Sequence, residues 1–238
     1  MFFGALRERN QGRRRVARMR WIAALAAFAL LAPPLAAATY VRGSIVPKLV
    51  CAADEAESYA YYLPSHFDGK TPAPVLFIFD PRGRGDVAAE LFRAAAEERG
   101  WILISSNDTR SDVPTWDSNL RAVRAIWNDA ATRFPIDPKR VYLTGFSGTA
   151  GLAWLVAAKT GAVAGIIASG GHAVDVGTAA KALTFDWYGF SGNGDFNNAN
   201  MRKLDADAAA AGLAHRVAFF DGGHRWAPPA RTGITSVS

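Results

Sequence analysis

Residues 140–151 have the sequence Arg-Val-Tyr-Leu-Thr-Gly-Phe-Ser-Gly-Thr-Ala-Gly. The segment 140–144 is short and mainly apolar, which predicts a buried strand. Beyond it, Leu152, Leu155 and Val156 recur at helical spacing, which predicts a helix. Ser147 therefore lies at a sharp bend between strand and helix, at the carboxyl end of the predicted sheet. The start of the helix offers free backbone N–H groups and the positive end of its dipole beside this side chain.

Ser147 has two interpretations. In one, the Gly-x-Ser-x pattern is a nucleophile elbow that exposes a reactive hydroxyl on a strained bend. In the other, Ser147 is an ordinary helix cap. The elbow requires a small residue two positions after the serine, because neighbouring strands crowd the bend. The β-branched Thr149 occupies that position, so we expect an imperfect elbow and a shifted or weakened site.

Strand and helix patterns alternate along the chain. The run Val75–Phe79 is apolar throughout, which is typical of a strand covered on both faces. Such alternation predicts an α/β fold, with a mostly parallel sheet and helices on both faces. The predicted strands are 44–52, 58–63, 75–79, 101–105, 140–144, 163–168, 183–190 and 216–220, and the predicted helices, besides the one after Ser147, are 87–99, 116–134, 179–182 and 200–211.

The chain contains four histidines, and the position of each relative to the strands ranks them as candidate bases. A catalytic serine needs a base within reach, and loops at the carboxyl ends of parallel strands supply such groups. His224 follows the last strand on a flexible glycine pair and is the predicted base. His172 also follows a strand and is the alternative. His66 precedes the parallel strands, and His215 lies at the opposite end of the last strand.

Asp195 is the predicted acid that orients His224. It lies in a glycine-rich turn after the strand 183–190. The order Ser147, Asp195, His224 along the chain matches the nucleophile–acid–histidine order of serine hydrolases that are built on parallel sheets. The competing interpretation is an ordinary turn aspartate. Asp186 lies within the strand and is expected to point into packing, and Asp221 is too close to His224 in sequence to face its ring.

An oxyanion hole requires two backbone donors. The first predicted donor is the N–H of Gly148, directly after the serine. The second should come from the loop after Val75–Phe79, where either Arg82 or Gly83 is suitably placed because Pro81 has no N–H. The sequence does not separate these two residues, and a plain turn is the alternative for this loop.

Four motifs together resemble the α/β-hydrolase superfamily. The likeness covers about residues 44–228 and is greatest to exported bacterial esterases similar to polyhydroxybutyrate depolymerases and feruloyl esterases. It implies a Ser147, Asp195 and His224 triad and hydrolysis of carboxylic esters. The chain departs from the family pattern at Thr149 and in its abrupt end after His224. The motifs are Val141-Tyr-Leu-Thr-Gly-Phe-Ser-Gly148, Phe79-Asp-Pro-Arg-Gly-Arg84, Gly194-Asp-Phe-Asn197 and Gly222-Gly-His-Arg-Trp226.

The positive charge of the chain is confined to its start. Residues 1–38 contain seven arginines and one acidic residue, which leaves 20 of the 27 basic and 20 of the 21 acidic residues for the rest of the chain. The net charge of +6 therefore belongs to the leader. The predicted folded domain, residues 39–238, has no overall charge that would attract nucleic acid.

Residues 1–38 have the parts of an export signal. A positive region is followed by the apolar core Trp21–Leu31, a Pro33-Pro34 break and a small-x-small site at Ala36–Ala38. The alternative is an uncleaved membrane anchor, since residues 21–41 carry no charge and are long enough to span a bilayer. The sequence therefore predicts a periplasmic or extracellular protein, or one anchored to the membrane by this segment.

The remaining expectations concern cofactors, partners and the end of the chain. No His/Cys/Asp cluster has metal-ligand spacing, so neither a metal nor an organic cofactor is predicted. A single cysteine, Cys51, excludes an internal disulfide and is expected to be a buried or partly buried strand residue. The substrate is expected to be a small or polymeric ester. One alternative is a hydrolase of peptide or thioester bonds, and another is a non-catalytic protein that binds a partner or ligand.

No helical pattern follows His224, so the fold is expected to lack its C-terminal helix. The sheet face that such a helix covers would then be bared, with Val217 or Phe219 part of it. Exposed apolar surface costs about 25 cal/mol per Å². We therefore expect either a homodimer through this face or a marginally stable fold with a mobile His224 loop.

Overall fold

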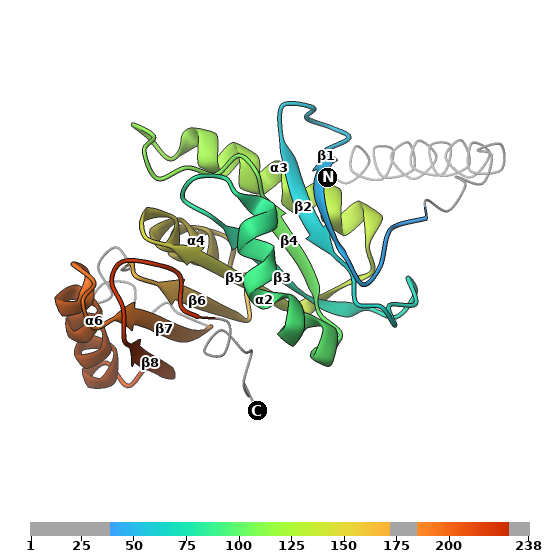
Figure 1. Cartoon of the computed structure of the whole chain (residues 1–238). Helices are drawn as coiled ribbons and strands as arrows, with labels where there is room; N and C mark the ends of the chain where they lie inside the picture. The colour runs from blue at the N-terminus through green and yellow to red at the C-terminus, as the bar shows by residue number, and fades with distance from the viewer. Residues whose placement is uncertain (1–38, 172–184, 229–238) are drawn as a thin grey trace, which may run out of the picture. The chain divides into compact units, whose positions relative to one another are not determined.

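An eight-stranded sheet forms the centre of the computed structural model, which describes residues 39–171 and 185–228 (Figure 1). The strand order is β1-β2-β4-β3-β5-β6-β7-β8. Strands β1, β2 and β4 pair antiparallel, and every pair from β4 through β3 to β8 is parallel. The prediction of a mostly parallel sheet is confirmed. The strands are β1 (Ile45–Val50), β2 (Ser58–Tyr62), β3 (Ala73–Phe79), β4 (Ile102–Ser106), β5 (Ile136–Phe146), β6 (Gly165–Ser169), β7 (Asp186–Gly192) and β8 (His215–Phe220).

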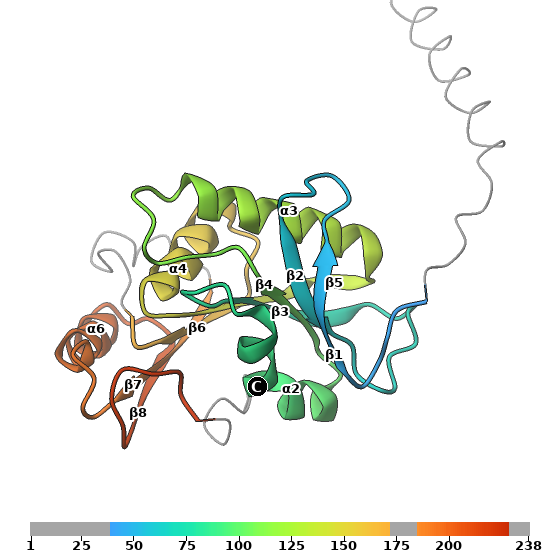
Figure 2. The ribbon, with the colours of Figure 1, turned by 45° about the horizontal axis from the view of Figure 1, so that its top comes forward.

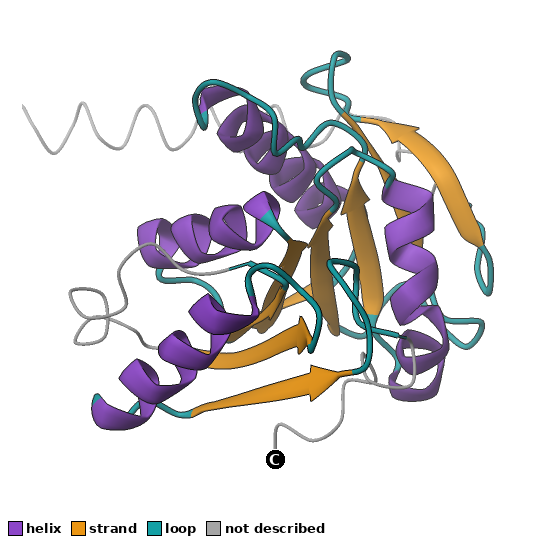
Figure 3. Cartoon of the chain, turned by 60° about the vertical axis from the view of Figure 1, so that its left-hand side comes forward, coloured by secondary structure: helices purple, strands orange, loops and turns teal. Residues whose placement is uncertain are grey.

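Helices cover both faces of this sheet, as predicted. In Figure 2, α3 and α4 lie above the sheet and α2 lies below it, and Figure 3 places α6 on the same side as α3 and α4. The predicted helix at 179–182 lies outside the described residues. The described helices are α2 (Gly85–Arg99), α3 (Asp117–Arg133), α4 (Gly148–Thr160) and α6 (Asn198–Ala210).

The apolar run of β3 explains why the sheet needs helices on both sides. Leu76 and Ile78 pack into a buried cluster with Phe92 of α2. The intervening Phe77 points to the other face, where its ring stacks on Trp127 of α3 with centroids 4.8 Å apart. Because successive side chains of a strand alternate between faces, each face contributes its own core. Each fully buried side chain of this size stabilises the fold by about 1.5–3 kcal/mol.

Local sequence signals locate several element ends. Helix α2 ends before Gly100, which adopts φ 72° as a left-handed cap. Strand β5 begins earlier than predicted, because Ile136 already pairs with Ala73 of β3.

Asp186 was expected to point into packing, and this expectation is wrong: it is exposed at the first position of β7, before the buried part of the strand.

The expectation that Val217 or Phe219 is bared is also wrong. In β8, Val217 lies beside Gly189 on the face that Met201 of α6 covers. Phe219 lies two residues further on the same face, and the Arg202 guanidinium of α6 lies 3.9 Å from the centre of its ring. Both side chains are half-buried, because strand alternation directs them toward α6. The tail 229–238 lies outside the described residues.

Two further expectations concern Cys51 and the leader. Cys51 is buried directly after β1, and this burial, with Asp129 and Glu57 nearby, raises the pKa of its thiol to about 12. Within residues 39–171 and 185–228, none of the helices combines the length and apolar character that crossing a bilayer requires. The predicted signal segment, residues 1–38, lies outside the described residues.

Candidate functional site

Ser147 occupies the bend between β5 and α4, with φ 55° and ψ −129°. It is the one described residue other than glycine with a positive φ. This conformation costs energy for a residue with a Cβ, and such strain persists only where the surrounding structure enforces it. The Ser147 side chain makes no capping hydrogen bond to α4. The structure therefore favours the elbow over the helix-cap interpretation of this residue.

His224 contacts both of the other predicted residues. Its Nε2 lies 2.9 Å from Ser147 Oγ, and its Nδ1 lies 2.9 Å from Asp195 Oδ1. A carboxylate can only accept, so Nδ1 carries the proton and Nε2 is left to accept from the serine hydroxyl. The structure thus brings Ser147, His224 and Asp195 into one hydrogen-bonded chain. The alternative base, His172, lies outside the described residues.

Backbone contacts hold the elbow in its strained form. The Ser147 N–H donates to the Ser169 carbonyl of β6 at 2.9 Å. A Cβ on Gly145 would lie 2.1 Å from the Thr149 carbonyl oxygen, and one on Gly171 would lie 2.1 Å from the Ser147 carbonyl oxygen. Both distances are far below van der Waals contact, so only glycine allows the chain to pack this closely on either side of the serine.

Thr149 is part of the elbow and does not disrupt it. The residue is fully buried, and its hydroxyl lies 2.6 Å from the Phe79 carbonyl of β3 and 2.7 Å from the Phe146 carbonyl. The Phe146 N–H donates to the same hydroxyl oxygen at 3.2 Å. The threonine therefore links the bend to the end of β3. The chain accommodates a β-branched residue here because its hydroxyl satisfies buried backbone groups.

Asp195 is 5% exposed in the turn after β7. Its Oδ1 also accepts the Asn197 N–H at 2.8 Å, and Asn197 in turn donates from its side chain to the Gly170 carbonyl at 2.8 Å. Gly170 has φ 56°, and a Cβ there would lie 2.9 Å from both Asp195 Oδ2 and the Phe146 ring. The loop after β6 thus packs directly over the carboxylate.

Two phenyl rings contact the His224 imidazole. The buried Phe146 ring lies 4.6 Å from it between centroids, and the Phe196 ring lies 4.1 Å away. Phe196 is 74% exposed, which is unusual for so large an apolar side chain. The imidazole therefore has an apolar surrounding on the protein side and an apolar side chain at the solvent side.

Comparison with solved structures identifies the architecture. A ferulic acid esterase superposes with a TM-score of 0.60 at 15% identity, covering 79% of this chain and 93% of the other. An S-formylglutathione hydrolase from Staphylococcus aureus gives 0.64 at 12% identity, covering 82% and 95%. The fluorophosphonate-binding serine hydrolase F of Staphylococcus aureus gives 0.63 at 11% identity, covering 78% and 93%.

The chain has the α/β-hydrolase fold. At these identities the likeness establishes the architecture alone. No protein-family model matches this chain. No curated protein matches it at the level of sequence either.

The predicted oxyanion donors of this α/β-hydrolase fold differ in availability. Gly148 is the first residue of α4, so its N–H has no partner within the helix. The Arg82 N–H donates to Asp80 Oδ1 at 2.9 Å, and the Gly83 N–H donates to the Asp80 carbonyl at 3.1 Å. Both candidates for the second donor are therefore engaged in their own turn.

Sequence reasoning missed four residues around the site: Asp80, Gly170, Phe196 and Trp226. Trp226 donates its indole N–H to Asp80 across 146 positions of sequence, a contact that no local pattern encodes. Phe196 belongs to the motif Gly194-Asp-Phe-Asn197, in which only the aspartate has a predicted role. A large apolar residue directly after the acid in a polar turn is a signal that could have pointed to Phe196.

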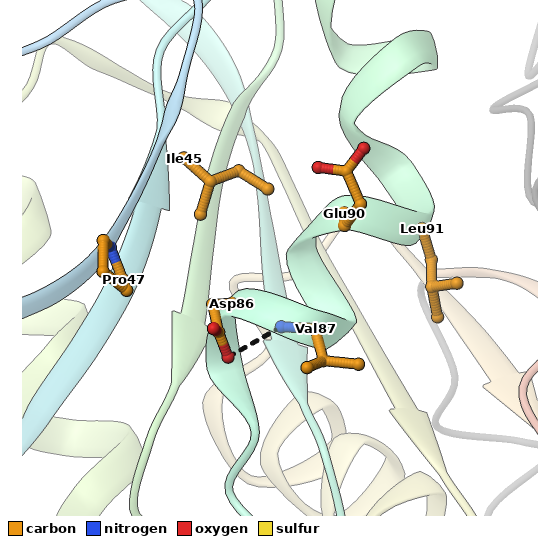
Figure 4. Close-up of a pocket in the computed structure, with 6 residues that line it drawn as sticks. All are labelled: Ile45, Pro47, Asp86, Val87, Glu90 and Leu91. Atoms are coloured by element: carbon orange, nitrogen blue, oxygen red, sulfur yellow. Dashed lines mark hydrogen bonds between the residues drawn. The ribbon is translucent and has the colours of Figure 1, made fainter.

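A separate hollow lies between β1 and the start of α2, with a volume of about 600 Å³ (Figure 4). None of the candidate site residues lines it. Within residues 39–171 and 185–228, no cluster of three or more His, Cys, Asp or Glu side chains is arranged to hold a metal ion. The lining residues of the hollow are Ile45, Pro47, Asp86, Val87, Glu90 and Leu91.

Proposed function

We propose that this protein is a serine hydrolase that cleaves carboxylic esters through an acyl-enzyme intermediate. The observation that carries the proposal is the hydrogen-bonded chain from Ser147 through His224 to Asp195, with both bonds at 2.9 Å. A nucleophile bonded to a base, and a base oriented by an acid, is the general signature of nucleophilic catalysis. The strained, half-buried position of Ser147 on the elbow supports the same role.

In the proposed first half-reaction, Ser147 Oγ attacks the acyl carbonyl carbon of the ester while its proton moves to His224 Nε2. Asp195 stabilises the imidazolium that forms and keeps the ring in its tautomer. The negative charge on the former carbonyl oxygen faces the Gly148 N–H and the positive end of the α4 dipole. When the carbon–oxygen bond breaks, His224 returns its proton to the departing alcohol, and the acyl group stays on Ser147.

In the second half-reaction, water replaces the alcohol. His224 Nε2 accepts a proton from water as the water oxygen attacks the acyl-enzyme. The tetrahedral intermediate then collapses, the carboxylic acid leaves, and Ser147 Oγ recovers its proton from His224. For Arg82 or Gly83 to act as the second oxyanion donor, its N–H must exchange its bond to Asp80 for a bond to the oxyanion.

A panel of acyl esters with varied chain length tests this function. The parent protein should hydrolyse at least one member, and Ser147→Ala should abolish that turnover while folding normally by circular dichroism. Equal rates for the parent and for Ser147→Ala on every hydrolysed ester would contradict the proposal. The ester that is hydrolysed fastest would show which length of acyl group the site accepts.

Two alternatives keep the same fold. A non-catalytic binding protein is favoured by one observation, namely that both candidates for the second oxyanion donor already have acceptors. A hydrolase of thioesters or peptides is the other, since the neighbouring structures include an S-formylglutathione hydrolase and fold does not determine function. Adding thioester and peptide substrates to the panel tests the second alternative, which predicts faster hydrolysis of one of these than of any ester. A fluorophosphonate probe that leaves Ser147 unlabelled would favour the first.

We further propose that the chain is exported and that residues 1–38 are removed. The positive region, apolar core and Ala36-x-Ala38 site support this proposal. Expression in a host with an intact export pathway should give a mature chain that begins near Thr39. Recovery of residues 1–10 by amino-terminal sequencing from a membrane fraction would support the uncleaved anchor instead. The expected homodimer loses its stated ground, because α6 packs against Val217 and Phe219, and sedimentation of the mature chain tests it independently.

A further inference from the structure

The loop that carries His224 has few backbone restraints of its own. The Phe220 and Gly222 carbonyls accept N–H groups from Asn193 and Gly194, each at 2.8 Å. Beyond Gly222, no backbone–backbone hydrogen bond restrains residues 223–228 within the described part of the chain. His224 therefore lies in a segment that is held by side chains and by the close packing of the Gly222 and Gly223 carbonyl oxygens against Gly192.

Trp226 supplies that restraint two residues after His224. Its indole N–H donates to Asp80 Oδ2 at 3.0 Å. Its ring lies 5.9 Å from Phe92 of α2, edge to face, and 5.5 Å from Phe146, which itself contacts the His224 imidazole. The indole is thus attached both to the sheet core and to the ring beside the base.

Asp80 is a fixed acceptor for this indole. The residue is 0% exposed, directly after β3, and Arg84 donates to both of its carboxylate oxygens from Nε and Nη2, each at 3.1 Å. Burial opposes ionisation of Asp80, but the hydrogen bonds from Arg84, Trp226 and the Arg82 N–H outweigh it and hold its pKa below the ordinary value. A buried charge with this many donors has little freedom to move.

We propose that Asp80 and Trp226 are positioning residues that hold the His224 imidazole against Ser147. The proposal rests on the proposed hydrolase function of the same site. The same carboxylate binds the Arg82 N–H and the Trp226 indole, so it ties the loop after β3 to the loop after β8. The buried Asp80 carboxylate therefore fixes the position of the candidate oxyanion loop and of the loop that carries the candidate base.

Trp226→Phe removes the indole N–H and keeps an aromatic ring in the same place. The matched control is Trp154→Phe in α4, because the Trp154 indole is also buried but its N–H has no partner among the described residues. On the fastest ester, Trp226→Phe should lower kcat by on the order of tenfold or more with little change in KM, since a misplacement of about 1 Å can cost about 100-fold. Trp154→Phe should leave kcat near the parent value.

Proton NMR of the His224 Nδ1–H provides a readout that does not require turnover. In the parent, this proton should be shifted downfield and exchange slowly, and it should disappear in Asp195→Asn. Trp226→Phe and Asp80→Asn should broaden or lose the signal, whereas Trp154→Phe should retain it. Asp80→Asn keeps the shape of the side chain and tests the contact from the other partner.

The two measurements separate failure of this inference from failure of the proposed function. If the parent hydrolyses esters but Trp226→Phe matches Trp154→Phe in kcat and in the Nδ1–H signal, the positioning role is wrong and the hydrolase stands. If the parent hydrolyses nothing, the Nδ1–H signal alone decides the positioning role. A kcat loss that Trp154→Phe reproduces would indicate a general packing defect and would also overturn the inference.

Discussion

The loop that carries Ser147 and the loop that carries His224 are held in different ways. Ser147 lies between a strand and a helix, with its N–H bonded to Ser169 and with glycines packed against backbone on either side. His224 lies beyond Gly222 in a segment that is restrained by the Trp226 indole and by the rings around the imidazole. Backbone geometry thus positions the candidate nucleophile, and side chains position the candidate base.

The two loops should therefore be sensitive to different kinds of substitution. The Ser147 half should fail when an added atom forces the backbone apart, because packed interiors do not absorb such an atom. The His224 half should tolerate an added atom at Gly223 but fail when a side-chain contact is removed. Substitutions in the two loops should therefore separate stability from turnover.

Removing the proposed nucleophile or the proposed base should have a greater effect than any other substitution. Ser147→Ala and His224→Ala should each lower kcat/KM on the best ester by on the order of 10⁴-fold or more, and the double variant should be little worse, because such groups act as a unit. Initial-rate kinetics on purified variants measures this. Additive losses in the double variant would mean that the two residues do not act together, despite the 2.9 Å contact.

The next effect compares added methyl groups in the two loops. Gly145→Ala places a Cβ 2.1 Å from the Thr149 carbonyl oxygen, whereas Gly223→Ala has no heavy atom nearer than 4.0 Å. Gly145→Ala should lower the free energy of unfolding by about 3 kcal/mol or prevent folding, since overpacking typically costs about 1–3 kcal/mol where neighbours can yield. Gly223→Ala should stay within about 1 kcal/mol of the parent. Chemical denaturation measures the free energy of unfolding of both variants, and equal values would contradict the proposed difference between the two loops.

A smaller effect tests the hydroxyl at the elbow. Thr149→Val keeps the shape but leaves the Phe79 carbonyl and the Phe146 N–H without this partner, which should cost about 1–3 kcal/mol of stability. Thr149→Ser retains the hydroxyl and is the matched control. Thermal unfolding of the pair measures the difference. A valine variant as stable as the serine variant would show that the hydroxyl does not hold the bend.

The smallest expected effect is the pH dependence of stability that comes from Asp80, which binds the His224 loop through Trp226. Because the folded-state pKa of Asp80 is lowered, its charge adds stability above the ordinary aspartate pKa of about 3.9, and this stability is lost as pH falls through the folded value. The stability gap between the parent and Asp80→Asn should be largest near neutrality and shrink below about pH 4. Denaturation series at pH 7, 5 and 3 measure it. A gap that widens in acid would contradict the charged role of Asp80.

Sequence patterns predicted most of the fold because the signals are local and periodic. The apolar run of β3 and the cap at Gly100 locate elements without knowledge of their neighbours. The pairing of Ser147 with His224 and Asp195 also followed from topology, because loops at the carboxyl ends of parallel strands converge.

The remaining features depend on contacts between distant segments. Thr149 looked unfavourable in sequence, yet its hydroxyl satisfies the Phe79 carbonyl 70 positions away. Val217 and Phe219 seemed uncovered because the face on which α6 packs is not encoded in β8 itself. The Asp80–Trp226 contact joins the loops after β3 and β8, and neither motif indicates the other.

Covalent labelling tests whether Ser147 is the activated nucleophile that we propose. The parent protein is treated with a fluorophosphonate probe, and intact mass followed by peptide mapping locates any adduct. If Ser147 is activated, the parent should carry a single adduct on Ser147, His224→Ala should be labelled much more slowly, and Ser147→Ala should not be labelled. A parent protein that remains unlabelled, or an adduct that persists in Ser147→Ala, would contradict it.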